Sequence, residues 1–260
     1  MTIDEYNKRV SSGTQRAVAV RASAVQRPWL PAVSLAALLV AYNNVLFLLP
    51  SSFAFPPLWL LALRALALPA LAVAWAVRFH GFDPTDLGLT SRGLARGVAL
   101  GLAGAAVVSL PAVLYFAFPL GVDGGSIDYE RAADDSAGEF VYWALVKYPL
   151  SAVFLEEVLF RGVLQSAAAR AYGLARGVVL TALAFSLWHV VVNYETMSDS
   201  NAADSDAFFA FAQVGALVAL FAGGVILSVL RLRTGSLAAP ITLHWLAVAA
   251  MRGALFALSR

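Results

Sequence analysis

The 260-residue sequence contains no cysteine and few charged residues. Without cysteine the chain has no disulfide bond, no thiolate metal ligand and no cysteine nucleophile. Charged residues make up 13% of the chain and hydrophobic residues 60%, and the formal net charge is +2. So small a positive charge gives no reason to expect a nucleic-acid partner. The composition is that of an integral membrane protein, so the lipid bilayer is an expected partner.

Long apolar runs recur along the chain, and each is long enough to cross a bilayer as a helix. About 20 helical residues, at roughly 1.5 Å per residue, cross the hydrocarbon. The sequence therefore predicts an all-α fold, a polytopic transmembrane helical bundle of about seven spans, at residues 29–49, 58–79, 94–120, 139–169, 174–193, 207–230 and 236–258. In the third run, Gly97, Gly101 and Gly104 have a spacing that permits close helix contact.

The distribution of charge divides the chain and orients it. Residues 1–27 form a basic tail that we expect to lie at the anionic cytoplasmic surface, and residues 28–260 form a single transmembrane helical domain. Basic connections alternate with acidic or uncharged ones; the basic ones are residues 78–96, 170–176 and 231–233. The positive-inside rule then places the N-terminus in the cytoplasm and the C-terminus outside, in a protein of the cell membrane.

The segment FLEEVLFRGVLQ, residues 154–165, places three charged residues inside an apolar run. Ionised side chains in a membrane helix are costly and mark functional sites. Glu157 and Arg161 are four residues apart, so they are expected to form an ion pair, whereas Glu156 points about 100° away and lacks a local cation. A buried carboxylate of this kind suits a general base.

Two histidines accompany this segment. A turn is expected near Tyr172 and Gly173. Glu156 lies about as many residues before this turn as His189 lies after it, so an antiparallel hairpin brings the two side chains to the same depth. His244 follows Pro240, which suits the first turn of a helix. We place the resulting site in the cytoplasmic half of the bilayer.

These motifs together resemble the CAAX protease and bacteriocin-processing family, the Abi-type membrane endopeptidases. The resemblance covers roughly residues 80–250 and includes GFDPTDLGL at 81–89. It rests on EExxxR at Glu156, Glu157 and Arg161, on FxxxH at Phe185 and His189, and on GSL and PI before His244. No segment matches the HExxH, GxSG or GxGD motifs of other membrane proteases.

The resemblance implies a glutamate-dependent intramembrane endopeptidase that needs no cofactor. By this similarity Glu156 activates the attacking water, and His189 helps to hold or deprotonate it. His244 stabilises the oxyanion or orients the scissile carbonyl, and Glu157 with Arg161 shapes the site. The implied substrate is a peptide or protein, either the C-terminal tail of a prenylated protein or a leader-bearing peptide.

One position departs from the family pattern. The family usually has Asn or Asp one helical turn after its last histidine, where this chain has Val248. Valine donates no side-chain hydrogen bond, and loss of an oxyanion donor costs roughly 10²-fold or more in rate. Asn193, one turn after His189, is a candidate replacement donor; its alternative interpretation is a cap at the helix end.

A zinc-dependent form of the protease and two other functions are the alternatives. A Glu and two His side chains are also ligands for zinc, with water in the fourth position. A non-catalytic scaffold or bacteriocin-immunity-type protein would bind a peptide or lipidated partner in the same cavity, and Val248 favours it. A proton-coupled transporter also uses Glu and His, but the chain shows no inverted repeat.

Overall fold

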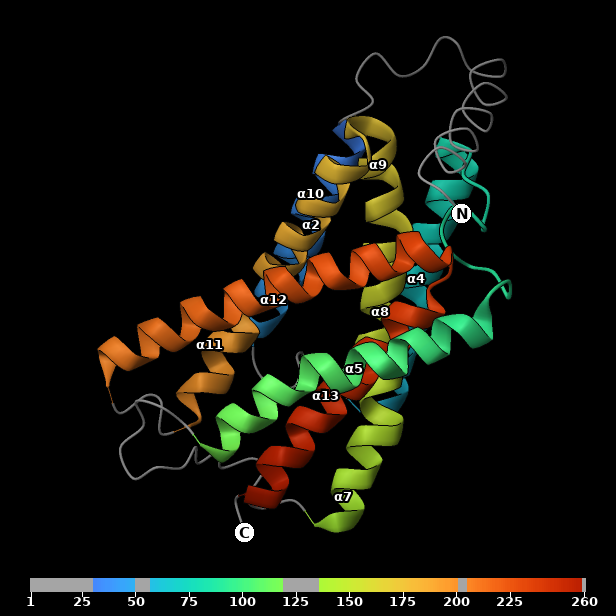
Figure 1. Cartoon of the computed structure of the whole chain (residues 1–260). Coiled ribbons are helices and arrows are strands. Elements are labelled where there is room, and N and C mark those ends of the chain that lie inside the picture. The colour runs from blue at the N-terminus through green and yellow to red at the C-terminus, as the bar shows by residue number, and fades with distance from the viewer. Residues whose placement is uncertain (1–29, 50–56, 119–135, 201–204, 259–260) are drawn as a thin grey trace.

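The computed structural model describes residues 30–49, 57–118, 136–200 and 205–258, and the elements in these ranges are helices (Figure 1). The predicted all-α class is therefore confirmed. The predicted basic tail, residues 1–27, lies outside the described residues.

Six helical stretches of the described chain are long and apolar enough to cross a membrane. They match six of the seven predicted runs. These stretches are α2 (Leu30–Leu48), α4 (Leu58–His80), the first part of α5 (Leu94–Ala117), α10 (Leu174–Trp188) with α11 (Val190–Ser198), α12 (Asp206–Thr234) and α13 (Ala238–Leu258).

The remaining predicted span, residues 139–169, is helical but is not among those six apolar stretches. It combines α-turns with wider π-turns: α7 (Ala137–Tyr142), η1 (Trp143–Lys147), η2 (Pro149–Val153), α8 (Phe154–Glu157), η3 (Val158–Leu164) and α9 (Gln165–Tyr172). Pro149 lacks the N–H that an α-turn needs, which accounts for an irregular turn beside it. Every residue of η3 is buried, so neighbouring helices rather than lipid surround its Arg161.

The α9–α10 hairpin brings Glu156 and His189 to the same level. Gly173, with φ of +84°, makes the turn between the helices, as the sequence predicted. Gly177 allows α10 to lie against α9, because a Cβ there would come within 2.7 Å of the Ala169 backbone nitrogen. Phe160, Phe185 and Trp188 then pack in one core cluster with Leu39 of α2.

The predicted close contact of the third run is confirmed, and its partner is α13. A Cβ added at Gly101 would lie 2.6 Å from the Thr242 Cβ, and one at Gly104 would lie 2.7 Å from a Leu243 methyl carbon. Helices α5 and α13 therefore lie against each other with their backbones close, and they cross near the centre of Figure 1. This contact fixes the helix that carries His244.

The connection between α4 and α5 anchors the start of α13. The Leu237 N–H donates to the Gly88 carbonyl at 3.0 Å. Arg231, near the end of α12, donates to the Asp86 carbonyl and, at 3.1 Å, to the Ser166 hydroxyl. These bonds tie the connection, α9, α12 and the first turn of α13 together.

Candidate active site

The predicted ion pair within the helical run is present and fully buried. Arg161 Nη1 lies 2.9 Å from Glu157 Oε1, and both side chains have 0% exposure. The Arg161 guanidinium also lies over the Phe185 ring, 4.0 Å from its centroid. The i, i+4 spacing of the sequence thus produced the expected contact.

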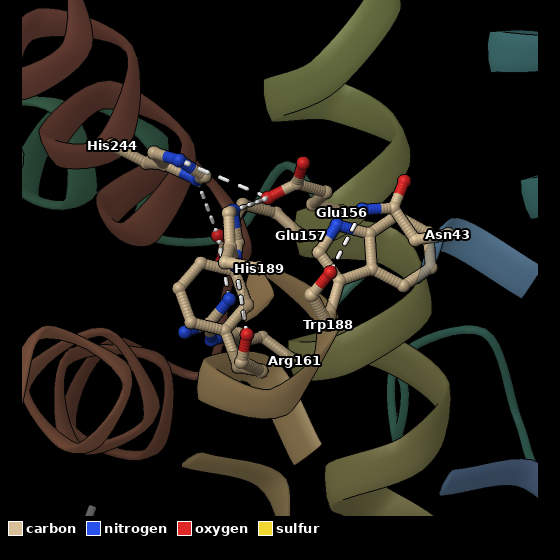
Figure 2. A network of polar contacts seen from close by, with 8 residues as sticks. Asn43, Glu156, Glu157, Arg161, Trp188, His189 and His244 are labelled. Carbon is tan, nitrogen blue, oxygen red and sulfur yellow. Dashed lines mark hydrogen bonds and ion pairs between the residues drawn. The ribbon is translucent and has the colours of Figure 1, made fainter. Parts of the chain in front are cut away.

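Glu156 faces both histidines, as the hairpin argument predicted (Figure 2). Its Oε2 lies 3.7 Å from His189 Nε2 and 3.9 Å from His244 Nε2. That oxygen is buried and has no hydrogen-bond partner among the described residues. Both separations exceed a direct hydrogen bond and are of the size that a bridging water spans.

His189 occupies the break between α10 and α11. Its backbone has φ −95° and ψ 4°, outside the helical range. Its Nδ1 lies 2.8 Å from the Phe185 carbonyl oxygen. A carbonyl oxygen only accepts hydrogen bonds, so this contact assigns the proton to Nδ1 and leaves the Nε2 lone pair facing Glu156.

His244 is held by the other carboxylate. Its Nδ1 lies 2.8 Å from Glu157 Oε1, the same oxygen that accepts from Arg161. From the sequence, Arg161 was the one partner predicted for Glu157, and the hydrogen bond to His244 was not predicted. Glu157 and His244 are 87 residues apart and meet only through the packing of α8 against α13.

Phe185 lies between the charged groups. Its ring makes edge contacts with the His189 ring, at 4.7 Å between centroids, and with the His244 ring, at 5.8 Å. The side chain is 2% exposed. Phe185 therefore buttresses both imidazoles and Arg161 with one rigid apolar surface.

Neither Asn193 nor Val248 supplies a polar contact to the site in the described structure. The α11 helix continues to Ser198, so Asn193 lies within it, and the interpretation of Asn193 as a cap at the helix end is wrong. The Asn193 Nδ2 is buried and has no hydrogen-bond partner among the described residues. Val248 lies one turn after His244 on α13, with an aliphatic side chain where a donor was expected.

The described part of the chain has no group of three or more His, Asp or Glu side chains arranged to hold a metal ion. The zinc alternative therefore finds no ligand set among these residues.

Residues 138–250 match the model of the family described as type II CAAX prenyl endopeptidase, Rce1-like. This segment of the chain is therefore an Rce1-like CAAX endopeptidase domain. The family is one of proteases, which are hydrolases. The Rce1-like region contains Glu156, Glu157, Arg161, Phe185, His189 and His244. No curated protein and no solved structure matches the chain.

The Rce1-like match begins at residue 138, whereas the resemblance seen in the sequence began near residue 80. Helices α2, α4 and α5 thus lie outside the matched region. One of them still reaches the site: Asn43 of α2 donates to the Trp188 carbonyl at 2.8 Å, next to His189 (Figure 2). Asn43 was not predicted from the sequence, although two adjacent amides, Asn43 and Asn44, stand out in an apolar helix.

Proposed function

We propose that this protein is an intramembrane endopeptidase that hydrolyses a peptide bond with water activated by Glu156. The observation that carries the proposal is the position of Glu156 Oε2, within 4 Å of the Nε2 atoms of both His189 and His244. A water at this point would contact a carboxylate and an imidazole lone pair together. Those are the groups that general-base hydrolysis requires.

In the proposed reaction Glu156 takes a proton from the water while His189 Nε2 accepts its other hydrogen bond. The water oxygen attacks the scissile carbonyl carbon and forms a tetrahedral intermediate. The protonated Glu156 then delivers its proton to the leaving amine as the carbon–nitrogen bond breaks. The Phe185 carbonyl supports this role, because it keeps His189 in the required tautomer.

His244 is proposed to stabilise the oxyanion. Because its Nδ1 donates to Glu157, its Nε2 donates as well only when the ring is protonated. With that proton, the cluster of Glu156, Glu157, Arg161 and His244 has two formal negative and two formal positive charges. A buried cluster without net charge avoids much of the desolvation cost of a charged one.

The proposed substrate is a peptide or protein. We propose either the C-terminal tail of a prenylated protein, which is supported by the words CAAX prenyl endopeptidase in the family description, or a leader-bearing peptide. A prenyl chain partitions into the bilayer, where each buried CH₂ contributes about 0.8 kcal/mol, and would so bring a substrate to a site that lies among membrane helices.

The second candidate function is a scaffold that binds a peptide or lipidated partner without cleaving it. Val248 supports this function, because the position lacks the hydrogen-bond donor expected for the oxyanion. The scaffold uses the same site but has no turnover.

The test uses the purified full chain in detergent with a quenched peptide library that includes prenylated and unprenylated C-terminal tails. The protease predicts new fragments, identified by mass spectrometry, that accumulate beyond one per protein molecule. Saturable peptide binding without fragments would contradict the protease and support the scaffold.

A further inference from the structure

The break between α10 and α11 is made by a side chain from another helix. In a continuous α-helix the Val191 N–H would donate to the Leu187 carbonyl. Here the Val191 N–H donates to Asn44 Oδ1 at 2.9 Å, and Asn44 Nδ2 donates to the Leu187 carbonyl at 2.8 Å. The Asn44 amide is therefore inserted into one rung of the helical ladder, an established cause of helix kinks.

Asn43 satisfies the next carbonyl along the break. Its Nδ2 donates to the Trp188 oxygen at 2.8 Å, and the residue is 6% exposed. Amides are costly in an apolar helix unless they are hydrogen-bonded. Both amides of α2 have their partners at this break, which gives a reason for two adjacent asparagines in a helix that is otherwise almost wholly apolar.

The break determines how the His189 ring is held. The His189 backbone N–H donates to the Ser186 carbonyl at 3.1 Å instead of to the Phe185 carbonyl, as an unbroken helix would require. The Phe185 carbonyl is thereby released and accepts from the imidazole Nδ1. Asn44, the helix break, the Phe185 carbonyl and the His189 tautomer thus form one chain of contacts.

We propose that Asn43 and Asn44 are positioning residues for His189, so that α2, which lies outside the Rce1-like region, is a working part of the active site. The kinetic part of this proposal rests on the proposed protease function. The structural part, the Nδ1-protonated tautomer of His189, is independent of any activity.

The structural part is tested by ¹⁵N NMR of the full chain labelled at histidine. The chain has three histidines, so His80→Gln and His244→Gln variants assign the His189 signals. The wild type is expected to show His189 in the Nδ1–H form, and Asn44→Leu is expected to show a mixture of the two tautomers. An unchanged Nδ1–H signal in Asn44→Leu would overturn the proposal.

The kinetic part compares Asn43→Leu and Asn44→Leu with Gln165→Met. Gln165 is the matched control, since its buried amide also bonds a carbonyl of another helix, Ser228, at 3.1 Å, but does so away from the break. Displacement of a reacting group by about 1 Å costs roughly 10²-fold in rate. We expect kcat to fall about 10²-fold in both asparagine variants, with KM within about twofold, and to stay near wild type in Gln165→Met.

A second variant, Asn44→Asp, covers the case in which leucine prevents folding. Aspartate keeps the acceptor for the Val191 N–H and loses the donor to the Leu187 carbonyl, so kcat is expected between those of wild type and Asn44→Leu. Equal losses in Gln165→Met and Asn44→Asp would overturn the positioning role. A wild-type chain with the Nδ1–H signal but no turnover would contradict the protease and still support the positioning of His189 by Asn43 and Asn44.

Discussion

At the residue scale, one carboxylate oxygen organises much of the site. Glu157 Oε1 accepts from both Arg161 and His244, and the side chains of Glu157 and Arg161 are completely buried. The Glu157–Arg161 bond was predictable because helical spacing places the two residues together. The Glu157–His244 bond was not, because no local pattern states which distant helix packs against α8.

Arg161→Met is predicted to destabilise the fold strongly. The substitution keeps much of the side-chain volume and leaves the Glu157 carboxylate buried with only His244 to balance it. Loss of one partner of a buried ion pair costs about 3–5 kcal/mol. Chemical unfolding in detergent measures the change, with Arg92→Met, at an exposed position, as the control. Equal stability of the two variants would contradict the buried pair.

Val248→Asn is predicted to raise activity. Asparagine places a donor one turn after His244, at the position where the family pattern has one, and an oxyanion donor contributes about 10²-fold. We expect kcat to increase by up to that factor with KM little changed, and Val248→Leu to leave kcat unchanged. A kcat for Val248→Asn no higher than that of Val248→Leu would show that the oxyanion is stabilised elsewhere.

At the element scale, turn counting placed Glu156 and His189 level because each lies about the same number of residues from Gly173. The predicted apolar run ended at Asn193, whereas α11 reaches Ser198. The π-turns of η1, η2 and η3 and the break at His189 were also not predicted. The break depends on the Asn44 amide of another helix and leaves no periodic signal in its own segment. Among the π-turns, only the irregular turn beside Pro149 has a cause that is visible in the sequence.

The α5–α13 contact predicts that an added methyl group lowers stability at Gly101 but not at Gly215. A Cβ at Gly101 would lie 2.7 Å from the Ala239 carbonyl oxygen, whereas a Cβ at Gly215 on α12 meets nothing within 4 Å. Gly101→Ala is therefore expected to lower stability by about 1–3 kcal/mol and to reduce activity, because α13 carries His244. Gly215→Ala serves as the control and is expected to change neither. Thermal unfolding and the peptide assay measure both; the same loss in the two variants would contradict the close packing.

At the scale of the whole molecule, hydropathy identified the membrane class and six of the spans because apolar length is a property of the sequence itself. The orientation of the bundle stays a prediction from the alternation of basic and acidic connections. The site lies among α8, α10 and α13, so its exposure to one side of the membrane depends on that orientation.

The absence of cysteine makes the orientation simple to test. Ser91 and Ser198 are both exposed, so each is a suitable position for a single cysteine. Ser91 lies in the basic connection 78–96, and Ser198 ends the α10–α11 stretch on the side predicted to be opposite. An impermeant thiol reagent added to intact cells should label Ser198→Cys, and should label Ser91→Cys only after the membrane is opened. The reverse pattern would place the N-terminus outside.

The central claim is that Glu156 activates the water, and the most direct measurement is the cleavage rate of Glu156→Gln. Glutamine keeps the size of the side chain but does not accept the proton at neutral pH. Glu139→Gln, on the exposed first turn of α7, is the matched control. The mechanism predicts that Glu156→Gln loses at least about 10²-fold in kcat while folding normally, and that Glu139→Gln cleaves at the wild-type rate. Cleavage by Glu156→Gln at the wild-type rate would contradict the mechanism.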